Sequence, residues 1–277
     1  MRLQVPVACL VLLWLSACGG GATAAPEVRP SSPQANNQRV VAGATVIDHG
    51  DGPKLCLGAV QTSLPPGCIG VPLDGWTWPK GSESSGGTRW GTYAVVGGYD
   101  GKRFSVTKTL DEDEAARHVR LDTPSDFGTR CPAPQGGWRA PKPRRATEED
   151  QERTFTTAER LPGYGTAWID DQGHSAQRSV NNVINVRVTT DVDGAARTLR
   201  RVWGGSLCVT KAKHTDSELR KVADSLMGRP GAISAGAGID NVAFEVVYDD
   251  GHLQRQLDGV YGAGLVLVAS ALQPYSG

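Results

Sequence analysis

The chain has 277 residues, enough for one large domain or two of ordinary size. Its 29 Lys and Arg balance its 29 Asp and Glu, which argues against a protein whose main task is to bind nucleic acid phosphates. The 35 glycines and 17 prolines predict many turns and short elements and exclude a long helical bundle. At 39% hydrophobic and 21% charged residues, the chain can bury a core and is not disordered throughout.

Residues 1–17 are typical of a signal peptide. The apolar run over 5–15 is too short to cross a bilayer as a helix, but it suits a signal-peptide core. It ends in Leu-Ser-Ala-Cys at 15–18, followed by three glycines. This motif resembles the lipobox of bacterial lipoproteins, which implies cleavage before Cys18 and a diacylglyceryl group on its thiol. The alternative is an ordinary secretory signal cut after Ala-Thr-Ala at 22–24, with Cys18 incidental.

A lipid anchor at Cys18 predicts a protein held on the extracytoplasmic face of the cell membrane, because two or more acyl chains on one residue anchor stably. Residues 18–39, rich in Gly, Ala, Pro, Ser and Asn, are expected to form a flexible tether. The arrangement also looks like that of uncharacterised lipoproteins of high-GC Gram-positive bacteria, a resemblance that implies no function.

Residues 40–131 read as a small β-rich domain, with the alternation of a five- or six-stranded barrel. Within it, Tyr-Asp-Gly-Lys at 99–102 carries the Asp-Gly signature of a hairpin turn. Residues 132–146 are rich in Pro, Gly and basic side chains and predict an extended inter-domain linker. Its charge suits a solvated spacer or, alternatively, contact with anionic lipid or wall polymer.

Residues 147–277 contain an internal duplication. Shifting residues 183–211 by 58 positions onto 241–269, without gaps, gives seven identities: Val188/Val246, Asp191/Asp249, Arg197/Arg255, Leu199/Leu257, Val202/Val260, Gly204/Gly262 and Leu207/Leu265. Each copy reads as strand, helix, strand, and a helix from Thr215 separates the copies. The expected fold class is therefore α+β, with one βαβ-α-βαβ sheet covered by helices on one face.

The segment over 164–272 also resembles, through short motifs, the pro-domains that precede secreted bacterial chymotrypsin-like proteases. The motifs are Ala-Trp-Ile-Asp at 167–170, the strand ending at Val188, the capped helix from Thr215 and Gly-Ile-Asp-Asn-Val at 238–242. Such modules act as folding templates and inhibitors. The resemblance implies a regulator or inhibitor of a secreted protease, and no protease follows in this chain.

Four cysteines follow the predicted lipidation site: Cys56, Cys68, Cys131 and Cys208. An even number in an oxidising compartment predicts two disulfides out of three possible pairings. The short turn-rich loop between Cys56 and Cys68 favours that pair, which leaves Cys131 with Cys208 by elimination. Metal binding by these thiols is disfavoured because the chain has no C-x-x-C motif.

The candidate binding surface lies around Trp76 and Trp78. In a strand these two residues share one face and could stack on sugar or peptide, with Trp90 nearby and Arg89 and Tyr93 as the closest polar groups. The alternative is a packed core face.

No motif of a familiar catalytic site, metal site or cofactor site is present, so we name no catalytic residue, metal or cofactor. Ser-Val-Thr-Lys at 105–108 matches S-x-x-K, but it falls in an expected strand, where residues three apart face opposite sides. The sequence thus favours an anchored lipoprotein that binds an envelope protein or wall polymer. A protease regulator and an enzyme with a scattered site are the alternatives.

Overall fold

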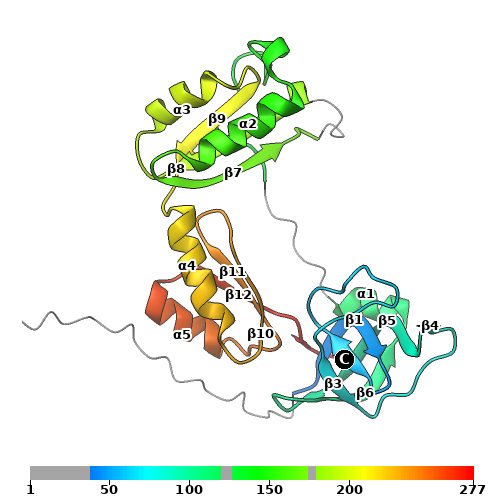
Figure 1. The fold of residues 1–277 in the computed structure, drawn as a ribbon. Helices are drawn as coiled ribbons and strands as arrows, with labels where there is room; N and C mark the ends of the chain where they lie inside the picture. The colour runs from blue at the N-terminus through cyan, green and yellow to red at the C-terminus, as the bar shows by residue number, and fades with distance from the viewer. Residues whose placement is uncertain (1–37, 120–126, 174–178) are drawn as a thin grey trace, which may run out of the picture.

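The computed structural model describes residues 38–119, 127–173 and 179–277. Within these residues the chain forms three sheets with helices between them, which confirms the α+β class. Figure 1 shows three parts in chain order: a β-rich part, a part built around β7–β9, and a part built around β10–β12. The predicted signal peptide, Cys18 and the tether up to residue 37 lie outside the described residues.

The N-terminal part is a closed barrel. Its strands are β1 (Val40–Asp48), β2 (Lys54–Cys56), β3 (Val71–Asp74), β4 (Glu83–Ser85), β5 (Thr88–Tyr99) and β6 (Phe104–Leu110). Pairing runs β1–β2–β3–β6–β5 and returns from β5 to β1, which closes a ring of five strands. The β5–β6 connection is the expected hairpin, with Gly101 at φ 95°. Helix α1 (Glu112–His118) follows β6 and begins at Asp111, whose side chain accepts from the Glu114 N–H.

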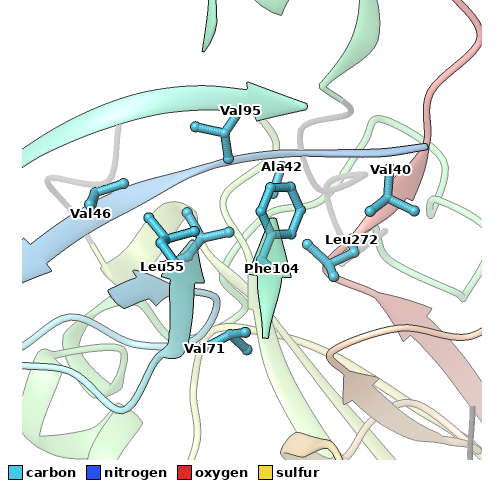
Figure 2. Close-up of a cluster of buried hydrophobic side chains, with 9 residues drawn as sticks. Val40, Ala42, Val46, Leu55, Val71, Val95, Phe104 and Leu272 are labelled. Atoms are coloured by element: carbon cyan, nitrogen blue, oxygen red, sulfur yellow. The ribbon is translucent and has the colours of Figure 1, made fainter. Parts of the chain in front are cut away.

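A seventh strand comes from the far end of the chain. Strand β13 (Gln273–Pro274) pairs antiparallel with β1, and the Tyr275 N–H donates to the Arg39 carbonyl at 2.9 Å. Figure 2 shows Leu272 among the barrel core side chains, beside Val40 and Phe104. The C-terminal residues therefore complete a domain that begins more than 200 positions earlier.

The second part has the order α-β-β-α-β. Its elements are α2 (Glu148–Glu159), β7 (Tyr164–Asp170), β8 (Val183–Val188), α3 (Val192–Arg200) and β9 (Ser206–Lys211). Strand β7 is antiparallel to β8, and β9 is parallel to β8 across the crossover helix α3. Helix α2 starts with a capping box of Thr147 and Asp150. Apolar side chains from β8, α3 and β9 form a core that includes Val186, Leu199 and Trp203.

The third part repeats that order with α4 (Asp216–Met227), β10 (Ala232–Ala237), β11 (Val242–Val246), α5 (His252–Tyr261) and β12 (Val266–Ser270). Strand β10 is antiparallel to β11, and β12 is parallel to it. The two parts thus share one element order and one pattern of strand pairing, over a longer segment than the sequence match. The expected single βαβ-α-βαβ sheet is wrong: there are two three-stranded sheets, because β10 pairs with β11 and not with the edge of the first sheet. Strand β10 is rich in Ala and Gly and lacks the alternation that marks a strand in sequence.

Residues 127–131, which precede α2, cross the β7–β9 sheet. We call residues 127–131 the strap. The Trp168 indole N–H donates to the Phe127 carbonyl at 2.6 Å, and the Asn185 amide donates to the Thr129 hydroxyl at 3.2 Å. A disulfide joins Cys131 to Cys208 on β9. The strap fixes the start of the second part to the sheet face opposite its helices.

The segment 132–146, expected to be an extended linker, also lies against the second part. The Lys142 N–H donates to the Gly204 carbonyl at 2.8 Å, and the Gly204 N–H donates to the Arg145 carbonyl at 2.7 Å. Ala146 is buried. Its Pro and Gly content explains why it forms only a short 3₁₀ turn at Pro143–Arg145, but these residues still pack through backbone hydrogen bonds.

The barrel core predicts a strong effect of Leu272→Ala. Leu272 is fully buried, so the substitution leaves a cavity and should lower the free energy of unfolding by about 3 kcal/mol. Leu267→Ala is the matched control, because Leu267 is 47% exposed and should change the stability by less than about 0.5 kcal/mol. Denaturant unfolding of both variants measures this, and equal losses would contradict the placement of the C-terminal residues.

The strap predicts an acid-sensitive contribution from Asp170. Its carboxylate accepts the Thr129 N–H at 2.6 Å and the Gln172 N–H at 2.8 Å. Burial raises the pKa of Asp170, but the hydrogen bonds from Thr129 and Gln172 outweigh it and hold the pKa below its ordinary value of 3.8. This stabilisation is therefore present above the unfolded-state pKa and is lost as pH falls through the lower folded-state pKa.

The check is denaturant unfolding of the parent chain and Asp170→Asn from pH 6 to pH 2.5. The parent should be more stable at pH 6, and the difference should shrink as pH falls below 4. A difference that is constant with pH would show that the Asp170 charge does not hold the strap.

Candidate binding surface

The aromatic residues predicted to bind are placed by the chain that leaves β3. An ion pair fixes the end of β3, because the Arg103 guanidinium donates two hydrogen bonds to the Asp74 carboxylate, at 2.5 and 2.7 Å. After Gly75, at φ 71°, the chain carries Trp76 and Trp78 back over the barrel core. The two tryptophans were expected in a strand. They lie instead in the irregular segment that follows β3, yet both still pack on the same core.

Three rings form one edge-to-face cluster. The ring centroids of Trp76 and Trp78 are 5.6 Å apart, and the ring of Tyr93 on β5 lies 5.0 Å from Trp76 and 6.4 Å from Trp78. These are the spacings that aromatic quadrupoles favour. All three side chains are half-buried, and Thr77 between the tryptophans is exposed. We call Trp76, Trp78 and Tyr93 the aromatic cluster. It closes part of the core and keeps a solvent-facing side.

Arg89 on β5 covers one ring of the aromatic cluster. Its guanidinium carbon lies 4.8 Å from the Trp78 ring centroid, within the range of a cation–π contact. Its Nε donates to the Ser82 hydroxyl at 2.5 Å. The predicted neighbour Arg89 thus belongs to the site and orders the turn after Trp78.

Trp90 does not join the aromatic cluster. It lies on the other face of β5, 8% exposed, and packs with Ile47, Cys56 and Cys68. The predicted binding surface is corrected in this respect: consecutive residues of a strand face opposite sides, so Trp90 and Arg89 are separated by the sheet. Trp90 instead packs against the Cys56–Cys68 disulfide.

The Trp76 indole carries an unsatisfied donor. Its Nε1 is buried and has no hydrogen-bond acceptor among the described residues. Buried indole N–H groups usually find a partner, as Trp203 does by donating to the Ser206 carbonyl at 2.8 Å. The Trp76 donor is therefore left unpaired beneath the surface of the aromatic cluster.

The structure also bears on the predicted cysteine pairs, on metal ligands and on membrane-spanning helices. The cysteines pair as predicted, Cys56 with Cys68 and Cys131 with Cys208. Within residues 38–119, 127–173 and 179–277, no three His, Cys, Asp or Glu side chains gather as metal ligands. Over the same residues, no helix is long and apolar enough to cross a membrane.

Sequence reasoning missed a cavity of about 720 Å³ in the second part. Its lining includes acidic side chains from the start of α2 and the end of β7, namely Glu148, Glu152, Asp170 and Asp171, together with polar Gln151, Ser179 and Asn182. These residues are dispersed over 35 positions of the sequence, so only the pairing of α2 with β7 brings them together.

Comparison with known proteins gives no match to a family model, a curated protein or a solved structure.

The unpaired indole predicts that Trp76→Phe is mild. The substitution keeps an aromatic ring and removes a buried donor without an acceptor, so the free energy of unfolding should change by less than about 1 kcal/mol. Trp203→Phe is the matched control, because it removes a buried hydrogen bond to the Ser206 carbonyl and should cost about 2 kcal/mol or more. Denaturant unfolding compares the two, and an equal or larger loss for Trp76→Phe would show a hidden partner of its N–H.

Proposed function

We propose that this protein is a lipoprotein anchored through Cys18 to the extracytoplasmic face of the cell membrane, with a binding role in the cell envelope. Its ligand is a wall polymer or an envelope protein that contacts the aromatic cluster. The observation that carries the binding role is a half-buried trio of rings with one indole donor left without an acceptor.

The geometry supports sugar or peptide as ligand. The half-buried rings offer apolar surface for stacking, and the buried Trp76 N–H would gain a hydroxyl or carbonyl acceptor only if the rings shift to admit one. Tyr93 and Arg89 add polar groups at the rim of the same surface. Both disulfides fit an oxidising compartment outside the cytoplasm, which the predicted signal peptide also implies.

The protease regulator stays a prediction from the sequence resemblance alone. The segment that carries this resemblance folds as parts of two αββαβ units.

The anchor is tested by Cys18→Ala in the full chain. The variant loses the acylated thiol, so the protein should move from the membrane fraction to the medium, whereas the parent stays with the membrane. Fractionation with immunoblotting measures the distribution. Retention of Cys18→Ala in the membrane would contradict the lipid anchor.

The binding role is tested with purified cell-wall material and the full mature protein. Trp76→Ala combined with Trp78→Ala should lower the bound fraction at least tenfold, because both stacking faces are lost. Phe127→Ala, which removes an exposed aromatic side chain elsewhere, should leave binding unchanged. Circular dichroism checks that the double variant is folded, and a folded variant with full binding would move the ligand away from the aromatic cluster.

A further inference from the structure

In each αββαβ unit, three residues that are paired across the three strands form a row on the sheet. The equivalent rows of the two units differ in their side chains and in how far they are covered. In the first sheet, Trp168 pairs with Asn185 and Asn185 pairs with Cys208, across all three strands. In the second sheet the corresponding row is Gly236, Ala243 and Leu267. The duplication aligns Asn185 with Ala243, and the strand pairing then aligns the two outer positions.

The first row is covered. Trp168, Asn185 and Cys208 are 7%, 1% and 1% exposed, because the strap crosses over them. The strap binds each member: Trp168 through the Phe127 carbonyl, Asn185 through the Thr129 hydroxyl, and Cys208 through the disulfide with Cys131. An extended polypeptide therefore seals the sheet face that the helices leave open.

The second row is open. Leu267 is 47% exposed, and Gly236, Ala243 and Ala269 are exposed as well. The opposite side of the same strands is buried, with Val242, Phe244, Val246 and Val266 packed under α4 and α5. Figure 1 shows both helices beside this sheet. We call Gly236, Ala243, Glu245, Leu267 and Ala269 the bare sheet face.

We propose that the bare sheet face binds an extended segment of a partner polypeptide, which crosses β10, β11 and β12 as the strap crosses the first sheet. The argument is internal to the molecule: the same αββαβ unit, at the same row, is sealed by an extended chain in its first copy. An exposed leucine at the position of the disulfide-bonded Cys208 offers apolar contact in place of the covalent link.

The differences between the rows specify the partner segment. Gly236 stands where the first sheet carries Trp168, so the β10 end of the row lacks a large side chain and the partner must supply a bulky apolar one over Gly236 and Ala243. Glu245 lies on the same face, paired with Ala269, where the first sheet has Arg187. A basic side chain in the segment would complement the charge of Glu245. This site is distinct from the aromatic cluster and does not depend on the lipid anchor.

The experiment places a photo-crosslinking amino acid at position 267 of the full chain in its own cells. The matched control carries the same group at Met227 on α4, which is 46% exposed but lies outside the bare sheet face. We expect an adduct from position 267 and none of the same mass from position 227. Mass spectrometry should map the adduct to one short segment of a partner protein.

A synthetic peptide of that mapped segment then tests the mode of binding. It should bind the purified full-length protein, and Leu267→Asp should weaken its Kd by about tenfold to a hundredfold while Met227→Asp leaves the Kd unchanged. Leu267→Lys serves as a second variant if Leu267→Asp does not fold.

Four results would overturn the proposal. These are no adduct at position 267, an adduct only with lipid, an adduct of two copies of this chain, and an adduct to residues 19–37 of the same chain. Equal peptide binding by folded Leu267→Asp and by the parent would do so as well.

Discussion

A three-stranded sheet with two helices has one covered face and one open face, and much of this structure follows from how the open faces are closed. In the first αββαβ unit the closure is covalent. The disulfide between Cys131 and Cys208 holds the strap across β7–β9, so that Trp168 and Asn185 become interior residues. Because the disulfide closes a loop of 77 positions, it removes much conformational freedom from the unfolded chain.

The barrel is closed in another way. Its strands close on themselves, so there is no open edge within the ring of five, and the core is sealed by Leu272 from the end of the chain. Several contacts join the third part to its neighbours. Arg187 on β8 pairs with Asp240 beside β11, and the C-terminal residues that follow β12 enter the barrel sheet. Thus each part depends on residues that belong to another part in the sequence.

The two αββαβ units differ in how far the sheet face opposite their helices is covered. Both units bury one sheet face under their helices. The second copy leaves its other side uncovered over the described residues, with a leucine in the middle. The aromatic cluster of the barrel is similar in kind: its rings are packed well enough to be held in place, yet the Trp76 donor has no acceptor there.

Local pattern predicted a large share of this fold. The capping residue Thr215 marked a helix start, the Asp-Gly turn marked the β5–β6 hairpin, and the duplicated spacing marked the two parallel strand pairs. The cysteine pairing followed from loop length and elimination. What the sequence could not supply was long-range pairing: β13 with β1, the strap over β8, and the division into two sheets.

For the site, adjacency in sequence was only a partial guide. Trp76, Trp78, Tyr93 and Arg89 do meet, because the chain after β3 folds back on β5. Trp90 is next to Arg89 in the sequence but is separated from it by the sheet, as alternation along a strand requires. The bare sheet face could not be predicted from the sequence, because its residues come from three strands and lie side by side only through the register of those strands.

Peptide mapping of the mature protein under non-reducing conditions tests the central claim most directly. If the strap closes the first sheet, one digest fragment must contain Cys131 linked to Cys208, and another must contain Cys56 linked to Cys68. A fragment that joins Cys131 to Cys56 or Cys68, or a free thiol at Cys208, would contradict the strap and the comparison between the two units that rests on it.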